Sequence, residues 1–158
     1  MTAGPGPASG PGVPAGEDVR TRRRDDYPVQ RAVPTRWADH DTYDHVNNAV
    51  HYQLMDTAVN GWLLDSSGVD VRKLPAMGLV VETGCRYFQQ IRFPQTVAVC
   101  IRLEGSGRSS VRYELGLFTD QQTPAAVARF VHVYVDRSTQ EPVAIPVEVE
   151  RALDQLRC

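Results

Sequence analysis

The sequence predicts an α+β domain in which one long amphipathic helix lies on an antiparallel sheet of about five strands. Three observations support this fold class. Apolar residues recur at helical spacing between positions 50 and 63. After position 80 the apolar period changes to two, and this pattern continues through four separate runs. Short turn signals divide these runs, and short gaps favour antiparallel hairpins.

The N-terminal segment, residues 1–26, is expected to lie outside the folded domain. Residues 1–16 hold five glycines and four prolines, a composition that cannot bury enough surface to become ordered. A basic linker with four arginines follows, and Asp25 and Asp26 supply counter-charges. We interpret residues 1–26 as a disordered tail and solvated linker, and residues 27–158 as a single domain. A nucleic-acid or localisation signal is the alternative interpretation of the arginines.

The first strand is expected at Val29–Trp37, where Pro34 favours an edge position or a bulge. The helix follows, from about position 48 to position 65. Asn47 or Asn48 suits its N-cap, and Gly68 suits the C′ position after its last turn. Its apolar face is formed by Val50, Leu54, Met55, Ala58, Val59, Trp62 and Leu63.

The remaining strands are expected at Val80–Phe88, Thr96–Leu103, Ser110–Leu117 and Val127–Val135. The last run carries aromatic residues on its second face as well, which favours an interior strand. Residues 69–77 are expected to form a loop, and residues 147–156 a terminal helix.

The most unusual stretch lies immediately before the helix. Three aspartates, two histidines and two asparagines stand between positions 39 and 48. The N-terminus of a helix presents unpaired N–H groups and a partial positive charge, so it binds an anion or a developing oxyanion. A carboxylate a few residues upstream can lie beside that site. Together they supply the minimum equipment for acyl transfer.

The pattern Asp39-x-Asp41-x-x-x-His45-Val46-Asn47-Asn48 resembles the signature of the hotdog-fold acyl-CoA thioesterases, in the group of 4-hydroxybenzoyl-CoA thioesterase. The resemblance covers roughly residues 27–146. It implies a hotdog fold, in which the sheet wraps around one long central helix. It also implies that the protein is an enzyme that hydrolyses an acyl-CoA thioester to a carboxylic acid and free CoA, with no cofactor. Members of this family are homodimers or homotetramers, and their acyl pocket lies between subunits.

The resemblance implies that Asp41 is the catalytic carboxylate and that the backbone N–H near Asn48 polarises the thioester carbonyl. Asp41 either attacks the carbonyl directly or activates water as a general base, and the sequence leaves both roles open. His45 either orients a water or is structural. Asn47 is most simply a cap, and its amide is also a candidate for holding the attacking water. Many relatives have glycine where this chain has Asp44, which adds an acid close to Asp41.

Candidate substrate contacts are spread over the rest of the chain. Arg108, Ser109 and Ser110 follow a glycine turn and are candidates for gripping CoA phosphates; a solvated hairpin tip is the alternative. Glu82 is a candidate acid near the thioester, or else a surface residue. Trp62 is a core residue first, and a possible acyl contact second. No metal site is expected, because the histidines lack the i, i+4 helical spacing of two-histidine zinc sites.

Partners and location follow from composition and from the strand after the helix. Residues 80–88 carry no proline and few charges, so this strand is a poorly protected edge suited to pairing with a second copy. With 17 basic and 19 acidic residues, the chain gives no reason to expect nucleic acid or a membrane as a partner. Three scattered cysteines, no apolar run of bilayer length and no signal-peptide core predict a cytoplasmic location.

Two other functions remain open at the level of sequence. A non-catalytic acyl-CoA-binding hotdog module is one, although such modules usually accompany an output domain. A hotdog hydratase acting on enoyl or hydroxyacyl thioesters is the other, although the Asp-and-His helix motif of those enzymes is not found here. Nothing in the sequence indicates the length of the acyl chain or whether it is aromatic.

Overall fold

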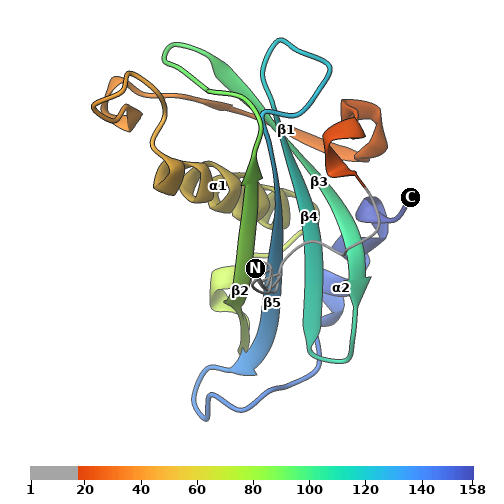
Figure 1. The fold of residues 1–158 in the computed structure, drawn as a ribbon. Coiled ribbons are helices and arrows are strands. Elements are labelled where there is room, and N and C mark those ends of the chain that lie inside the picture. The colour runs from red at the N-terminus through yellow and green to blue at the C-terminus, as the bar shows by residue number, and fades with distance from the viewer. Residues whose placement is uncertain (1–17) are drawn as a thin grey trace, which may run out of the picture.

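The sheet has five antiparallel strands in the order β1-β3-β4-β5-β2, as seen in a computed structural model that describes residues 18–158 (Figure 1). The expected tail, residues 1–16, lies outside the described residues. The strands are β1 Val29–Pro34, β2 Ala76–Tyr87, β3 Thr96–Ser106, β4 Ser110–Phe118 and β5 Ala126–Asp136. The predicted class, a helix on an antiparallel sheet of about five strands, is confirmed.

The helix α1, Asn48–Ser66, is 19 residues long and packs against one face of this sheet (Figure 1). Asn47 is its N-cap and Gly68, at φ +72°, follows its last turn, as the sequence predicted. The apolar stripe of α1 shares one core with alternate residues of β3, β4 and β5, among them Tyr113 and Phe130. A short helix α2, Val147–Leu153, closes this core at the C-terminal end of α1.

The position of β2 differs from the simplest interpretation of the turn signals. The gap before β3 resembled a hairpin loop, yet β2 pairs with β5 at one edge and β3 pairs with β1 at the other. Residues 88–95 therefore cross from β2 at one edge of the sheet to β3, which lies next to the other edge strand, β1. β2 also begins at Ala76, inside the expected loop, because its first residues pair with the end of β5. β1 ends at Pro34, which is on an edge strand as predicted.

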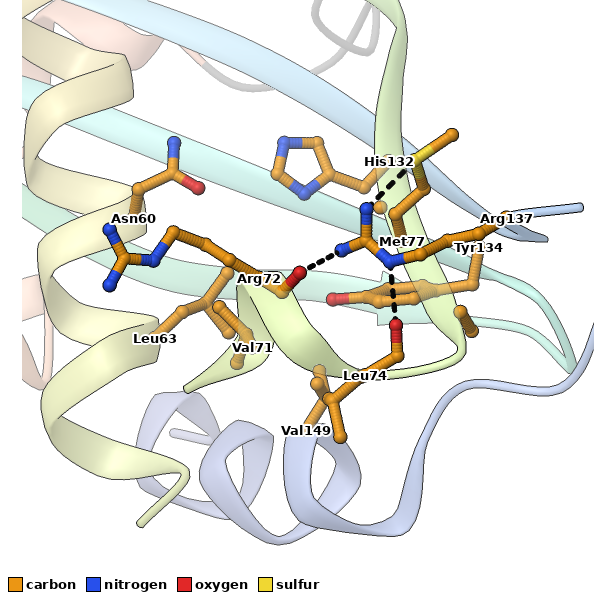
Figure 2. A pocket seen from close by; sticks show the side chains of 12 residues that line it. Asn60, Leu63, Val71, Arg72, Leu74, Met77, His132, Tyr134, Arg137 and Val149 are labelled. Carbon is orange, nitrogen blue, oxygen red and sulfur yellow. Dashed lines mark hydrogen bonds between the residues drawn. The ribbon is translucent and has the colours of Figure 1, made fainter. Parts of the chain in front are cut away.

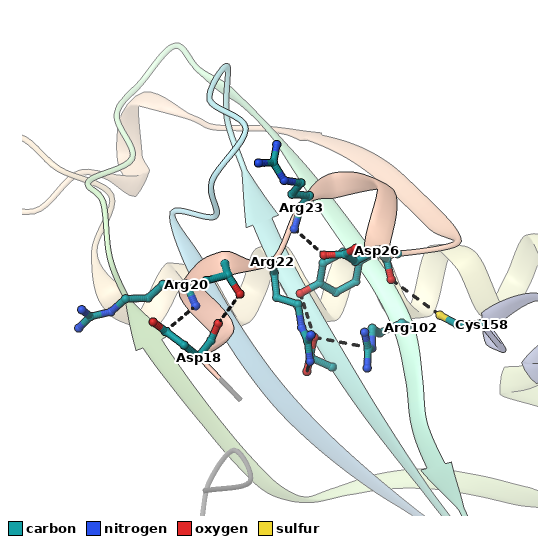
Figure 3. Close-up of polar contacts among 10 residues, drawn as sticks. Asp18, Arg20, Arg22, Arg23, Asp26, Arg102 and Cys158 are labelled. Carbon is teal, nitrogen blue, oxygen red and sulfur yellow. Dashed lines mark hydrogen bonds and ion pairs between the residues drawn. The ribbon is translucent and has the colours of Figure 1, made fainter. Parts of the chain in front are cut away.

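Residues 18–27 are not the solvated linker that the sequence suggested. They form two 3-10 turns on the face of the sheet opposite α1 (Figure 3). Val19 is buried, and the guanidinium of Arg22 pairs with the buried carboxylate of Glu114 at 2.9 Å. The hydroxyl of Tyr27 donates to the same carboxylate at 3.0 Å. The arginine run was interpreted as a linker because its charge pattern does not reveal that Glu114, on β4, is the ion-pair partner of Arg22.

Within residues 18–158 no helix is long and apolar enough to cross a membrane.

Candidate active site

The polar stretch between β1 and α1 is held by the crossing segment 88–95. At one end of the stretch, the N–H and the hydroxyl of Thr35 both donate to the carbonyl of Gln95, at 3.1 and 2.7 Å. At the other end, the N–H of Val46 donates to the carbonyl of Ile91 at 2.8 Å. These bonds fix both ends of the loop, so the residues between them have a defined geometry.

Asp39 orders the first half of the loop. Its buried carboxylate accepts hydrogen bonds from the backbone and the guanidinium of Arg36, with the shortest at 2.7 Å. Burial opposes ionisation, but the bonds and the charge of Arg36 outweigh it and lower the pKa of Asp39. The carbonyl of Asp39 accepts from the N–H of Asn47 at 2.9 Å. Asp39 is therefore a structural residue of this loop, in the ordinary use of aspartate in turns.

Asp41 begins a tight turn that ends at His45. One carboxylate oxygen accepts from the N–H of Tyr43 at 2.8 Å and from the N–H of His45 at 3.4 Å. The backbone N–H of Asp41 donates to the carbonyl of His45 at 2.9 Å. Among the described residues, none donates to the second oxygen, Oδ2. One side of the carboxylate is thus fixed by the backbone, while the other is open to a water or a substrate.

Asp44 occupies the left-handed position of this turn, with φ at +62°. Glycine adopts that conformation freely and aspartate tolerates it, which explains how an aspartate can stand at a position where the resemblance predicts glycine. The N–H of Phe93 donates to Nε2 of His40 at 2.8 Å, so the ring proton lies on Nδ1. Nδ1 faces the carboxylate of Asp44 at 3.4 Å.

The helix start follows this turn in the chain and provides one backbone donor. The side chain of Asn47 accepts from the N–H of Ala49 at 2.9 Å, and its carbonyl accepts from the N–H of Val50 at 2.9 Å. The N–H of Asn48 donates to no acceptor within residues 18–158. The hydroxyl of Tyr87, at the end of β2, donates to the carbonyl of Asn48 at 3.3 Å. The edge strand β2 therefore ends against the first residue of α1.

Buried and paired histidines support this end of the fold. His51 is buried, with Nδ1 at 3.1 Å from the carbonyl of Asn47, and burial lowers its pKa. The side chain of His45 turns toward Arg92, whose guanidinium lies at 3.1 Å from Nε2. His45 contributes its backbone N–H to Asp41 rather than its ring. Its side-chain geometry favours the structural alternative.

The predicted substrate contacts are not gathered around Asp41 within one chain. Arg108, Ser109 and Ser110 lie in the β3–β4 hairpin, at the opposite end of β3 from the Asp41 loop. Since β3 has 11 residues, the two ends are roughly 35 Å apart. Glu82 lies on the face of the sheet away from α1 and pairs with Arg129 at 3.5 Å.

Trp62 is fully buried about four turns along α1 from Asn48, roughly 20 Å away. Its indole N–H faces the side chain of Gln155 at 3.4 Å, and its ring packs edge-on against Tyr113. Trp62 is a core residue here, as its place on the apolar face of the helix predicted.

Sequence reasoning missed the contribution of the crossing segment. Arg92 and Phe93 contact the two loop histidines, although they lie far from them in sequence. Trp37 is 74% exposed and packs edge-on against Phe93. Trp37, His40, Asp41 and Asp44 line an open hollow of about 440 Å³. The available signal was the Phe93-Pro94 pair in the gap between β2 and β3. Within residues 18–158, no group of three or more His, Cys, Asp and Glu side chains is placed to hold a metal ion.

The comparisons with known proteins agree with this fold. The PA5185 protein of Pseudomonas aeruginosa is 43% identical with a TM-score of 0.82, over 85% of this chain and 95% of that one. A thioesterase from Thermus thermophilus, solved with coenzyme A and Zn, is 27% identical with a TM-score of 0.70, over 82% and 94% of the two chains. A 1,4-dihydroxy-2-naphthoyl-CoA thioesterase from Synechocystis shares the fold, at 14% identity and a TM-score of 0.74, over 80% and 96%.

None of the curated proteins matches the chain at a significant level. The model of the thioesterase-like superfamily matches residues 35–153, which begin just before the Asp41 loop and end with α2. The chain therefore belongs to the thioesterase-like superfamily, within the hotdog-fold thioesterases.

Proposed function

We propose that the protein hydrolyses acyl-CoA thioesters, with Asp41 as the catalytic carboxylate and the N–H of Asn48 as an oxyanion donor. The observation that carries the proposal is the pairing of a backbone-anchored carboxylate, whose Oδ2 has no donor within residues 18–158, with the start of a 19-residue helix. The helix dipole and the N–H of Asn48 favour negative charge at that point. In this proposal α1 is the central helix of the hotdog fold, and it presents its N-terminus to the substrate.

Two routes use the same groups. As a general base, Asp41 takes a proton from water while the water oxygen bonds to the thioester carbon. The carbonyl oxygen becomes an oxyanion at Asn48, the C–S bond breaks, and the CoA thiolate leaves and is protonated. As a nucleophile, Asp41 itself bonds to the carbon and expels the thiolate, and water then hydrolyses the mixed anhydride. Asn47 serves either route by capping the helix.

The proposed active unit is a homodimer, or a homotetramer built from such dimers, formed through β2. This edge strand exposes several apolar residues, and Val81, at its bulge, is 59% exposed. An unpaired apolar edge is a template for another strand, and pairing it with a two-fold copy closes the assembly. Antiparallel pairing also sets the start of one β2 beside the Tyr87 end of the other.

In such a dimer, the predicted CoA-binding residues that lie far from Asp41 in the same chain come near the partner's Asp41. Each subunit's β3–β4 hairpin, with Arg108, Ser109 and Ser110, lies at the same end of the sheet as the start of its β2. In a two-fold dimer that end faces the partner's Asp41 loop. The hairpin is thus a candidate for the CoA phosphates of the partner's site. The solved complex of the Thermus thermophilus thioesterase with coenzyme A supports CoA as the carrier.

A thiol-release assay over a panel of acyl-CoA substrates tests the activity. Asp41→Asn keeps the shape of the turn and removes the charge, so turnover should fall by about 10²-fold or more. Asp44→Asn is the matched control, because it makes the same chemical change in the same loop while sparing the proposed catalytic group. Equal activity of Asp41→Asn and the wild type would overturn the assignment. Loss in Asp44→Asn alone would move the role to Asp44.

The oligomer is tested by light scattering together with activity. Val81→Lys places a charge on the exposed edge without changing the backbone, and Val81→Thr is its uncharged control. Lysine should weaken assembly and reduce turnover in parallel, whereas threonine should change both little. A wild-type monomer of 17.5 kDa that is fully active would contradict the dimer.

A further inference from the structure

A second hollow lies far from the Asp41 loop of the same chain. It has a volume of about 140 Å³ and opens between the second half of α1, the start of β2, the end of β5 and α2 (Figure 2). Its lining includes Asn60, Leu63, Met77, His132, Tyr134 and Val149. Figure 2 shows Asn60 on α1, whereas His132 belongs to β5.

His132 is the unusual member of this lining. The side chain is only 3% exposed, and within residues 18–158 neither ring nitrogen has a hydrogen-bond partner. Burial lowers its pKa, although the charge of Asp56 opposes this, so the ring is neutral at pH 7. A neutral imidazole offers one donor and one acceptor. Leaving both unused in a buried place is unfavourable, so such a group indicates a ligand or a role.

Two other polar groups of the cavity wall are already engaged. The guanidinium of Arg137 donates to the carbonyls of Leu74 and Arg72, both at 2.6 Å. The amide nitrogen of Asn60 donates to the carbonyl and the carboxylate of Asp56. Burial raises the pKa of Tyr134 to about 12, so its hydroxyl stays neutral. His132 is therefore a buried, neutral polar group of this wall that has no hydrogen-bond partner within residues 18–158.

The size of the cavity limits that partner. An apolar cavity of about 150 Å³ holds one benzene molecule. A space of about 140 Å³ has room for a ring or a short chain of that size; Leu63, Met77 and Val149 supply the apolar part of its wall, and Arg72 and Arg137 line it as well. The neutral imidazole of His132 can form a hydrogen bond with one hydroxyl group on that ring or chain.

We propose that this cavity binds the distal part of a hydroxyl-bearing acyl group, with the hydroxyl hydrogen-bonded to His132. The link to the acyl group rests on the proposed function and its dimer. Antiparallel pairing of β2 sets Ala76 and Met77 of one subunit beside the partner's β2 end, where Tyr87 contacts Asn48 within each chain. In such a dimer, an acyl group whose thioester lies at the helix start of one subunit extends toward this cavity in the other subunit.

Binding alone is tested with two probes of the same size. Full-length protein labelled with ¹⁵N-histidine is titrated with phenol and with toluene, which differ by a hydroxyl in place of a methyl group. Phenol should shift the His132 ring resonances and bind about tenfold more tightly than toluene, from one hydrogen bond made in a buried place. His132→Leu should remove the preference, and His132→Gln, which keeps a donor and an acceptor, should retain it. Equal binding of the two probes, or no movement of the His132 resonances, would overturn the proposal.

Turnover separates this inference from the proposed function. Hexanoyl-CoA is compared with the isomers of hydroxyhexanoyl-CoA in the wild type and in His132→Leu. One isomer should be preferred by about tenfold in kcat/KM, and in His132→Leu the kcat/KM of that isomer should equal the value for hexanoyl-CoA measured with the same variant. A preference unaffected by the variant would refute the acyl assignment. If phenol binds but no thioester is hydrolysed, the proposed function fails and the cavity remains a binding site.

Discussion

The buried carboxylate of Glu114 makes a quantitative test of the N-terminal segment possible. Glu114 is 5% exposed and accepts two hydrogen bonds from Arg22, at 2.9 and 3.2 Å, and one from Tyr27 at 3.0 Å. Nε of Arg102 lies at 3.7 Å from the same carboxylate. The informative change is Arg22→Met, which keeps the apolar stem of the side chain and removes the charge.

The expected loss of stability depends on which contacts of the Glu114 carboxylate the substitution removes and which remain. Removing one partner of a buried ion pair costs about 3–5 kcal/mol, because the remaining charge stays buried. Here Arg102 and Tyr27 still contact the carboxylate, so the lower end applies, about 3 kcal/mol. For a domain of this size, each kcal/mol shifts Tm by roughly 2–4 °C. Arg22→Met should therefore lower Tm by roughly 6–12 °C.

The assay is urea and thermal unfolding of a double-mutant cycle. Arg22→Met combined with Glu114→Gln should be more stable than Arg22→Met alone, because the unpaired charge is gone. Arg23→Met is the matched control; its side chain is exposed, and the change should fall within about 0.5 kcal/mol. If Arg22→Met and Arg23→Met unfold alike, residues 18–27 do not pack on the sheet, and the reasoning fails.

Two further predictions concern the Asp41 loop and the buried histidines. Asp44→Gly should retain most of the thiol-release activity and fold at least as stably, because glycine adopts the positive φ without strain; a loss of more than about tenfold would give Asp44 a part in the chemistry. The pKa values of His51 and His132 are lowered by burial, so the unfolded chain binds more protons, and stability should fall as the pH drops below about 6.5. His132→Leu should reduce this fall and be at least as stable as the wild type at pH 8, whereas His51→Leu, which loses a bond to Asn47, should be less stable; thermal melts at pH 8 and pH 5.5 check both.

The helix and its caps could be predicted because their signals are local. The spacing of the apolar residues fixed the buried face of α1, and Asn47 and Gly68 marked its ends within one residue. The alternating runs located four strands for the same reason. The partner of β2 could not be predicted, because alternation tells which face a strand buries and not which strand lies beside it.

The candidate site divides in the same way. The Asp41 turn and the helix start are contiguous in sequence, so a motif captured them together. The supports from Arg92 and Phe93 depend on a crossing segment whose path only the fold reveals. His132 gave no signal either, because a histidine in an apolar strand usually finds a partner in the core, and its lack of one is visible only in three dimensions.

The order of the strands also has a consequence during synthesis. The two edge strands, β1 and β2, are made first, and the strand that pairs with β2 is the last of the five, starting at Ala126. On the ribosome, α1 and β2 therefore emerge before their packing partners, and the apolar residues Leu79, Val80 and Val81 have no neighbouring strand until β5 has been made. Such non-local pairing slows folding and prolongs the exposure of the apolar, aggregation-prone strand β2. We expect the yield of folded protein to rise at lower expression temperature. At higher temperature, the protein that fails to fold should be found in the aggregated fraction.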